Sequence, residues 1–213
     1  MIDKIKYKNI TFNNLSEKDF LKLMDGKGLF TFPAAPPLAT LKLNSEYHES
    51  LINSDYVFFD SGYFVLLLRY LKGIKVRKFS GYKFLKLLFN FLKLNQESKI
   101  FLVDPSNKTS ENNFKYIKNL GCKNIKRYVA PIYDIISIKD GALLNEIREY
   151  QPEFIIINLG GEVQEVLGNF LKLNVNFKSK IICTGGAISY FTKDQAPIND
   201  TIDKLYLGWF FRL

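Results

Sequence analysis

Two runs of the chain decide its fold: residues 155–161, Ile-Ile-Ile-Asn-Leu-Gly-Gly, and residues 181–187, Ile-Ile-Cys-Thr-Gly-Gly-Ala. Each run begins with apolar, β-branched residues and then stops on glycines, a pattern typical of a buried strand followed by a tight turn. Turns at the carboxyl edge of an α/β sheet leave backbone N–H groups open to phosphate-bearing ligands. The two runs therefore predict a cradle for a nucleotide-like ligand.

Outward from these runs, short apolar segments alternate with amphipathic ones. Further strands are expected at residues 29–32, 56–59, 99–103 and 124–129, and helices at 38–51, 63–71, 82–94, 107–120, 142–150 and 162–172. Residues 1–14 are expected to be extended, with a turn at Asn13 and Asn14, and Ser16 is expected to cap a helix together with Asp19. The alternation predicts a Rossmann-like α/β fold, a mostly parallel sheet with helices on both faces, in a single domain over residues 1–213.

The composition supports a substantial core and predicts a cytoplasmic protein. Hydrophobic residues make up 47% of the 213 residues, which argues against global disorder. No run of 18 apolar residues is free of charge, so no membrane-spanning helix is expected. The first residues lack the apolar stretch of a signal peptide.

Cysteine and histidine are too few for the usual zinc frameworks. The chain has two cysteines, Cys122 and Cys183, and one histidine, His48. Cys183 lies in a strand-like run and is expected to be a small core residue, and no disulfide is expected in a reducing compartment. His48 lies in a polar helical stretch, where a surface position is expected, and no Ser-His-Asp or Cys-His catalytic group is indicated.

The net charge of +9 indicates an affinity for polyanions, such as anionic lipid headgroups, nucleic acid or phosphorylated substrates. Basic and apolar residues interleave between residues 72 and 93. A core helix with a lysine-rich solvent face is the favoured interpretation, and a basic amphipathic helix on a membrane is the alternative. No helix-turn-helix, RNP or zinc pattern is present, so nucleic acid is not an expected partner.

Asp60 follows the expected strand at 56–59 and precedes a helix, a position where α/β proteins often carry active-site residues. It is either the N-cap of that helix or a general base or sugar-hydroxyl ligand. Gln164 and Glu165, at a helix start, are similarly candidate capping residues. Neither glycine pair forms a GxGxxG or a Walker motif, so each alone is a weak signal.

Residues 159–165, Leu-Gly-Gly-Glu-Val-Gln-Glu, resemble the Leu-Gly-x-Pro-x-Gln-Glu signature of the WecG/TagA/CpsF glycosyltransferases. The Gly-Gly-Ala at 185–187, the Ala-Pro at 196–197 and the closing run at 205–213 are similar to the end of that family's pattern. Upstream, the loop at Asp60 looks like its Pro-Asp-Gly-x-Gly element. Lys78-x-x-Gly81 resembles its Arg-x-x-Gly element.

This resemblance implies a Rossmann-like enzyme that needs no metal or cofactor other than its UDP-sugar donor. It would transfer an N-acetylmannosamine-type sugar or another hexose to a lipid-diphosphate-linked acceptor during cell-envelope or capsular polysaccharide assembly, peripheral to the inner face of the plasma membrane. By the same resemblance, Asp60 is the catalytic base, Gln164 lies near the donor diphosphate and Tyr133 stacks on uracil. The remaining expected residues are Gly160, Gly161, Gly185, Gly186 and Ser189 for the donor, and Lys78, Lys83 and Arg212 for the acceptor or the membrane.

The chain departs from the family pattern at several positions. The polar Thr-Pro-Asn is Phe32-Pro33-Ala34 here, an acid is replaced by Lys83 and a carboxylate by Ser189. The family's basic, membrane-docking tail would follow Leu213. These departures motivate a second hypothesis, that of a catalytically degraded member acting as a binding or partner subunit. A homo-oligomer or a partner that supplies the tail is compatible with either hypothesis.

Overall fold

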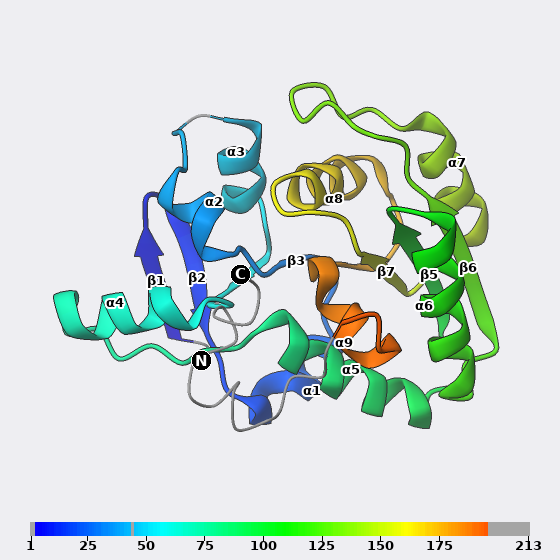
Figure 1. The fold of residues 1–213 in the computed structure, drawn as a ribbon, viewed down its shortest axis with the longest axis horizontal. Helices are drawn as coiled ribbons and strands as arrows, with labels where there is room; N and C mark the ends of the chain where they lie inside the picture. The colour runs from blue at the N-terminus through cyan, green and yellow to red at the C-terminus, as the bar shows by residue number, and fades with distance from the viewer. Residues whose placement is uncertain (1–2, 44, 196–213) are drawn as a thin grey trace.

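The computed structural model describes residues 3–43 and 45–195 of the chain. One eight-stranded sheet crosses these residues in the order β1-β2-β4-β3-β8-β7-β5-β6 (Figure 1). Its strands are β1 (Asp3–Tyr7), β2 (Ile10–Asn14), β3 (Gly28–Thr31), β4 (Tyr56–Phe58), β5 (Lys99–Asp104), β6 (Asn124–Val129), β7 (Phe154–Ile157) and β8 (Lys180–Cys183).

The sheet is mixed but mostly parallel. Only β1 runs antiparallel to its neighbour among the described strands, and every pairing from β2 across to β6 is parallel. The carboxyl ends of seven strands therefore lie along one edge, and both glycine-ended runs finish there. The predicted α/β class with a mostly parallel sheet is confirmed.

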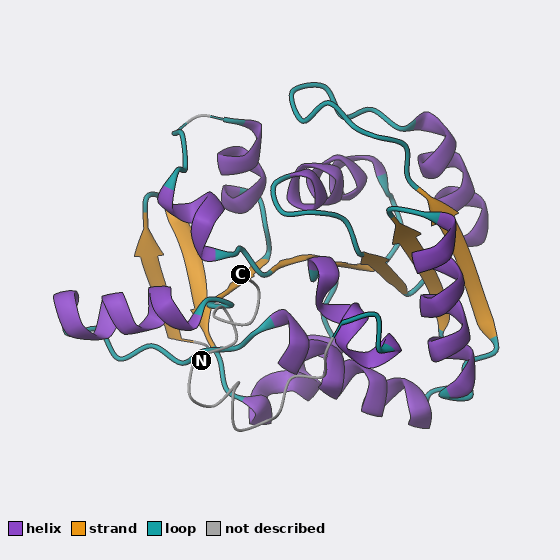
Figure 2. Ribbon diagram, viewed as in Figure 1, coloured by secondary structure: helices purple, strands orange, loops and turns teal. Residues whose placement is uncertain are grey.

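Helices cover both faces of the sheet, as the purple ribbons on either side of the orange strands show in Figure 2. One face carries α2, α3, α7 and α8, and the other carries α1, α5, α6 and α9 (Figure 1). The helices are α1 (Phe20–Met24), α2 (Ala35–Ala39), α3 (Glu46–Ile52), α4 (Gly62–Lys72), α5 (Gly81–Leu94), α6 (Asn107–Asn119), α7 (Gly141–Tyr150), α8 (Val163–Asn174) and α9 (Ser189–Thr192), with 3₁₀ turns η1 (Glu17–Asp19) and η2 (Gly185–Ile188).

Alternating strand residues supply two cores, one on each face. In β7, Ile155 and Ile157 pack in the cluster with α8, whereas Phe154 and Ile156 pack in the cluster with α5. Successive side chains of a strand point to opposite faces, so a strand buried on both sides must be apolar throughout. Burial of both strand faces is therefore the reason why the strands appear in the sequence as continuous apolar runs.

The expected helix at residues 38–51 is wrong in its extent. The structure has two short helices there, α2 and α3. Pro36 and Pro37 lie in the first turn of α2, where a backbone N–H has no partner within the helix and proline is therefore tolerated. Ser45 is the N-cap of α3, and its hydroxyl oxygen accepts a hydrogen bond from the N–H of His48. The helical periodicity of 38–51 thus concealed a second helix start.

The turn expected at Asn13 and Asn14 is also wrong. Lys8 and Asn9 make the turn between β1 and β2, with φ angles of 48° and 64°. Asn13 lies inside β2, and its side-chain oxygen accepts a 2.9 Å bond from the N–H of Val57 in β4. Asparagine is favoured in turns. Here its side-chain amide instead adds one hydrogen bond to the short pairing between β2 and β4.

The surface position expected for His48 is wrong, because the side chain is only 1% exposed. Its Nε2 lies 2.8 Å from the carbonyl oxygen of Lys8, so the ring ties α3 to the β1–β2 turn. By contrast, the core interpretation of the basic stretch is confirmed for α5, where Phe84, Leu85 and Leu88 are buried. None of the helices within residues 3–43 and 45–195 is both long and apolar enough to cross a bilayer.

Candidate functional site

Asp60 lies at the carboxyl end of β4, and one of its carboxylate oxygens accepts a 2.8 Å bond from the N–H of Gly81. Gly81 is the first residue of α5, so the carboxylate sits where the helix dipole favours negative charge. The N-cap of α4 is Ser61, whose hydroxyl oxygen accepts from the N–H of Phe64. Asp60 is therefore not the helix cap that its position also allowed.

The start of α5 also meets the end of β8. A β-carbon placed at Gly81 would lie 3.3 Å from the β-carbon of Thr184, the residue just before the second glycine pair. A glycine at this position lets the helix approach that closely. Asp60 is therefore bonded to Gly81, and Gly81 in turn lies against Thr184. Three segments that are distant in the chain meet at this point of the sheet edge.

Gln164 is 4% exposed and joins α8 to the bend after β8. Its Oε1 accepts a 2.7 Å bond from the N–H of Gly185, and its Nε2 donates a 3.0 Å bond to Glu165. Gly185 has a φ of +58°, a conformation that side chains other than glycine rarely adopt. The structure thus brings Gln164 and Gly185 together, with the side chain of Gln164 bracing the bend.

Glu165 is buried directly behind Gln164 and is 1% exposed. Burial raises the pKa of its carboxyl group to about 7, and the bond from Gln164 opposes that rise. The phenol of Tyr47 in α3 is buried near it, and burial together with the Glu165 charge raises the pKa of that phenol. A strongly perturbed carboxyl group at a sheet edge is a feature often found near functional sites.

The remaining glycines of the two bends leave the backbone open. A β-carbon placed at Gly160 or Gly186 would meet no atom within 4 Å, and one at Gly161 would meet only Pro37 of α2, at 3.7 Å. The hydroxyl of Ser189 donates a hydrogen bond to the carbonyl of Gly186. Ser189 and Gly186 are therefore neighbours, and small ligand groups can approach the backbone at both bends.

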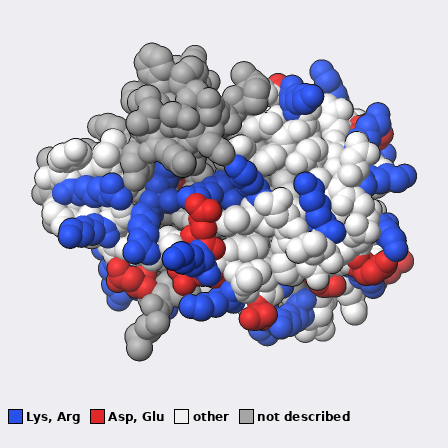
Figure 3. All heavy atoms as spheres, turned by 90° about the horizontal axis from the view of Figure 1, so that it is seen from below, with Lys and Arg blue, Asp and Glu red and all other residues white. Residues whose placement is uncertain are grey.

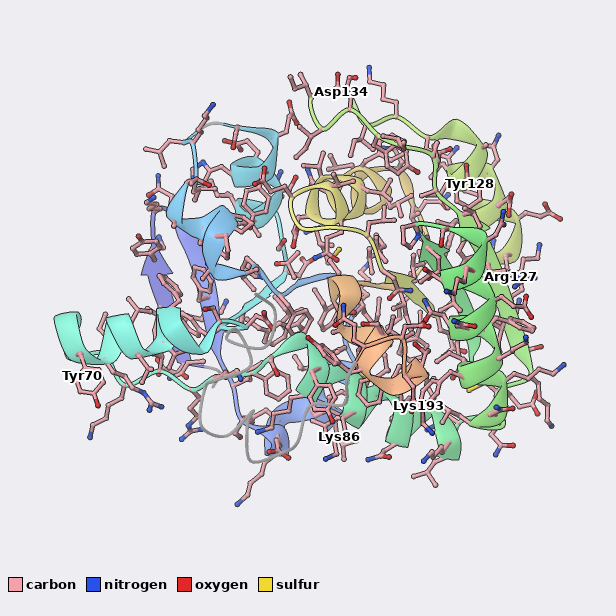
Figure 4. The ribbon with its side chains drawn as sticks, viewed as in Figure 1. Tyr70, Lys86, Arg127, Tyr128, Asp134 and Lys193 are labelled. Atoms are coloured by element: carbon pink, nitrogen blue, oxygen red, sulfur yellow. The ribbon has the colours of Figure 1, made fainter. Side chains whose placement is uncertain are left out.

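Tyr133 lies in the loop between β6 and α7, whose top is marked by Asp134 in Figure 4. Its hydroxyl donates a 2.6 Å bond to Asp140, the N-cap of α7, and Tyr128 donates to the same carboxylate at 3.0 Å. Burial first, and then the bond to Asp140, raises the pKa of Tyr133. The phenol is thus anchored to α7, and its expected stacking on uracil stays a prediction.

Lys78 and Lys83 are among the residues that line a surface hollow. Lys83 forms an ion pair with Glu17, so its ammonium group faces η1. Lysine and arginine side chains gather on the left of the face that Figure 3 shows. The hollow is lined by Leu15, Ser16, Glu17, Lys18, Arg69, Arg77, Lys78, Phe79 and Lys83.

One residue that lines the hollow is bonded to the strand end that carries Asp60. The N–H of Phe79 in its lining donates a 3.0 Å bond to the carbonyl of Phe59, the residue before Asp60. Arg212, the third residue expected here, lies outside the described residues, as does the closing run at 205–213.

Asp104 is a second polar group at the same edge, and it is not among the site residues expected from the sequence. Asp104 ends β5 fully buried, and one of its oxygens accepts bonds from Asn113 at 2.6 Å and Asn158 at 2.7 Å. Burial raises the pKa of Asp104. Asn158 precedes the first glycine pair, a signal that the sequence offered. No group of three or more His, Cys, Asp or Glu side chains in the described ranges is arranged to hold a metal ion.

Comparison with protein families identifies the chain. A model of the glycosyl transferase WecG/TagA/CpsF family matches residues 4–213. The chain belongs to this family. Comparison with curated proteins finds no match. This WecG/TagA/CpsF member is thus a glycosyltransferase by family, with sugar-donor and acceptor substrates, and the recognition made from its motifs is confirmed.

Proposed function

We propose that the protein transfers an N-acetylmannosamine-type sugar or another hexose from a UDP-sugar to a lipid-diphosphate-linked acceptor, as one domain over residues 1–213. The observation that carries the proposal is the succession of Asp60, Gly81 and Thr184 at the sheet edge. It sets one carboxylate beside a glycine bend with open backbone, so that a general base and a site for the donor diphosphate lie close together.

In this reaction Asp60 is the general base. Its carboxylate takes the proton of the acceptor hydroxyl while the hydroxyl oxygen attacks the anomeric carbon and the bond to UDP breaks. The N–H of Gly81 holds one carboxylate oxygen and so fixes the plane of the group. Such fixed orientation lowers the barrier, because the base need not be positioned during reaction.

The donor diphosphate would lie against the two glycine bends. Backbone N–H groups at Gly160, Gly161 and Gly186 would stabilise the charge that grows on departing UDP, and this role underlies our proposal of a metal-independent transfer. Ser189 would support the bend through Gly186, Gln164 would hold Gly185, and Tyr133 would stack on uracil. Burial of Gln164 and its two internal bonds favour a bracing role for it over direct contact.

The acceptor would enter from the basic hollow. In the sheet order the hollow lies toward β2, Asp60 follows at β4, and the glycine bends lie at β8 and β7. Lys78 and Lys83, with Arg212 beyond the described residues, would attract the acceptor diphosphate and an anionic membrane surface. The base would thus stand between the two substrates, and the protein would act peripherally at the inner face of the plasma membrane.

One observation favours the alternative of a binding or partner subunit. Phe32, at a position where the family pattern has a polar residue, is buried and stacks on Phe58 with ring centroids 4.6 Å apart. The side chain at this position is thus part of the hydrophobic core and offers no polar group to the donor. A subunit of this kind would bind a UDP-sugar without transferring the sugar.

The deciding experiment measures binding and transfer separately. Thermal unfolding is followed with millimolar UDP or UDP-sugars, since a ligand that binds only the folded protein raises Tm. Transfer is followed by UDP release with a lipid-diphosphate-linked acceptor. A rise in Tm with UDP release supports the enzyme, a rise without release at any donor supports the subunit, and no rise with any UDP-sugar overturns both.

A further inference from the structure

A chain of hydrogen bonds runs from the buried carboxyl group of Glu165 to the backbone of the bend after β8. Glu165 Oε1 accepts from Gln164 Nε2 at 3.0 Å, and Gln164 Oε1 accepts from the N–H of Gly185 at 2.7 Å. All three residues are buried. The thiol of Cys183 also donates to the backbone carbonyl of Gln164, at 3.2 Å, so β8 and the start of α8 are bound together twice.

A side-chain amide has two orientations of nearly equal shape, and only one of them serves this bend. With the observed orientation, the oxygen of Gln164 faces the N–H of Gly185. If the amide turned over, its NH₂ group would face that N–H, and two donors would oppose each other in a buried space. The acceptor that Glu165 offers to Nε2 selects the productive orientation.

The surroundings of Glu165 show that this carboxyl group does not serve the packing alone. Its Oε2 and the hydroxyl of Tyr47 are both buried and have no hydrogen-bond partner among the described residues. Polar groups left in this state cost stability. The groups that face Glu165 are Tyr47 from α3, Cys183 from β8 and Glu162 at the start of α8. An apolar residue of similar size would avoid the cost but would leave Gln164 without its acceptor.

We propose that Glu165 is a positioning residue that holds the amide of Gln164 so that it fixes Gly185 and the shape of the bend that receives the donor diphosphate. The inference rests on the proposed donor site for its consequence in catalysis. The bend itself does not depend on that proposal, so its geometry can be tested alone. Glu165 acts through Gln164 and touches no reacting atom.

The test of geometry is the backbone amide of Gly185, observed by NMR in the full chain. In the native protein, its chemical shift should change with pH around a midpoint near 7, following the carboxyl group of Glu165. Glu165→Gln keeps an oxygen acceptor and should retain the exchange protection of that amide while abolishing the pH response. Glu165→Met removes the acceptor, and protection at Gly185 should fall at least about tenfold.

The test of consequence uses UDP as the probe. Glu165→Met should weaken UDP binding about tenfold, and Glu165→Gln should restore it to within about threefold of native. Glu149→Gln, on the exposed side of α7, is the matched neutral change and should alter nothing. If native protein does not bind UDP, the proposed function fails while the Gly185 measurements still decide the positioning role.

Two results overturn the inference. One is a Gly185 amide in the native protein whose chemical shift does not change as the side-chain carboxyl resonance of Glu165 itself titrates, at whatever pH that titration occurs. The other is a folded Glu165→Met variant with unchanged protection at Gly185. If that variant does not fold, the comparison of native protein with Glu165→Gln decides, because the two side chains have the same size and differ in their titration.

Discussion

The carboxylate of Asp60 and the N–H of Gly81 are joined by a 2.8 Å bond that ties the end of β4 to the first residue of α5. Gly81 in turn lies against Thr184, next to the Gly185 bend. This relationship makes one carboxylate both a structural acceptor and the proposed base. The two roles can be separated, because the first needs only an oxygen and the second needs a negative charge.

Asp60→Asn separates them. The asparagine oxygen can still accept from Gly81, so Tm should change little, while transfer should fall by about 10²- to 10⁴-fold with the loss of the base. UDP release and Tm are measured on the same preparation. Asp55→Asn is the control, because Asp55 accepts from the N–H of Leu29 and pairs with Lys172, remote from the glycine bends. Transfer that survives Asp60→Asn intact would refute the assignment of the base.

Three glycine-to-alanine changes test the donor cradle. Gly185 and Gly73 have φ values of +58° and +62°, so alanine at either position should cost about 1 kcal/mol of stability. Gly186 is open and does not have a positive φ, so alanine there should leave stability within about 0.5 kcal/mol. If the cradle is assigned correctly, Gly185→Ala and Gly186→Ala weaken UDP binding and Gly73→Ala does not. Calorimetric titration measures the affinity for UDP, and denaturant unfolding measures the free energy of unfolding.

Gly168 tests the packing of α8 on the sheet. A β-carbon there would lie 2.7 Å from Leu29 Cδ1 and 2.8 Å from the sulfur of Cys183, both in the core. Alanine gains about 1 kcal/mol in helix propensity, but overpacking costs about 1–3 kcal/mol, so we expect net destabilisation. Denaturant unfolding measures it, and Gly141→Ala, with no atom within 4 Å, is the control. Adding Cys183→Ala should recover part of the loss, and a stabilised Gly168→Ala would show that α8 packs less closely.

The sheet was predictable because its strands are apolar on both faces, and the runs at 155–157 and 181–183 admit few other structures. The β1–β2 turn was not, since Asn13 carries a turn residue's signal and yet pairs with Val57 through its side chain. Asp60 could be placed at the sheet edge from its position after a strand. Its partner Gly81 could not, because their bond joins segments 21 residues apart and depends on how α5 packs.

The basic hollow predicts a dependence on anionic lipid. Lys78→Ala should weaken binding to vesicles that contain phosphatidylglycerol by about fivefold, since one lysine near such a surface contributes about 1 kcal/mol. Raising the salt concentration should reduce the difference, because exposed charges are screened. Lys115→Ala on α6 removes an exposed lysine outside the hollow and is the control. Equal losses for the two variants in a vesicle sedimentation assay would assign the affinity to net charge instead of the hollow.

Glu165 predicts how stability depends on pH. The pKa of its carboxyl group is raised in the folded protein from 4.5 to about 7, so between these values the folded state holds a proton that the unfolded state has lost. Its contribution to stability is therefore present below pH 4.5 and is lost as pH rises through 7. The glutamine of Glu165→Gln does not ionise, so this variant avoids the cost of a buried charge at pH 8. It should be more stable than the native protein at that pH by on the order of 3 kcal/mol.

Burial also raises the pKa of Asp104, so the native protein alone does not isolate the effect of Glu165. The difference between native and Glu165→Gln does, because Asp104 is common to both. Urea unfolding at intervals from pH 4.5 to 8.5 should show this difference growing across the range and then levelling. A constant difference would mean that Glu165 titrates at its ordinary pKa, and the carboxyl group would then carry a full charge behind Gln164 at neutral pH.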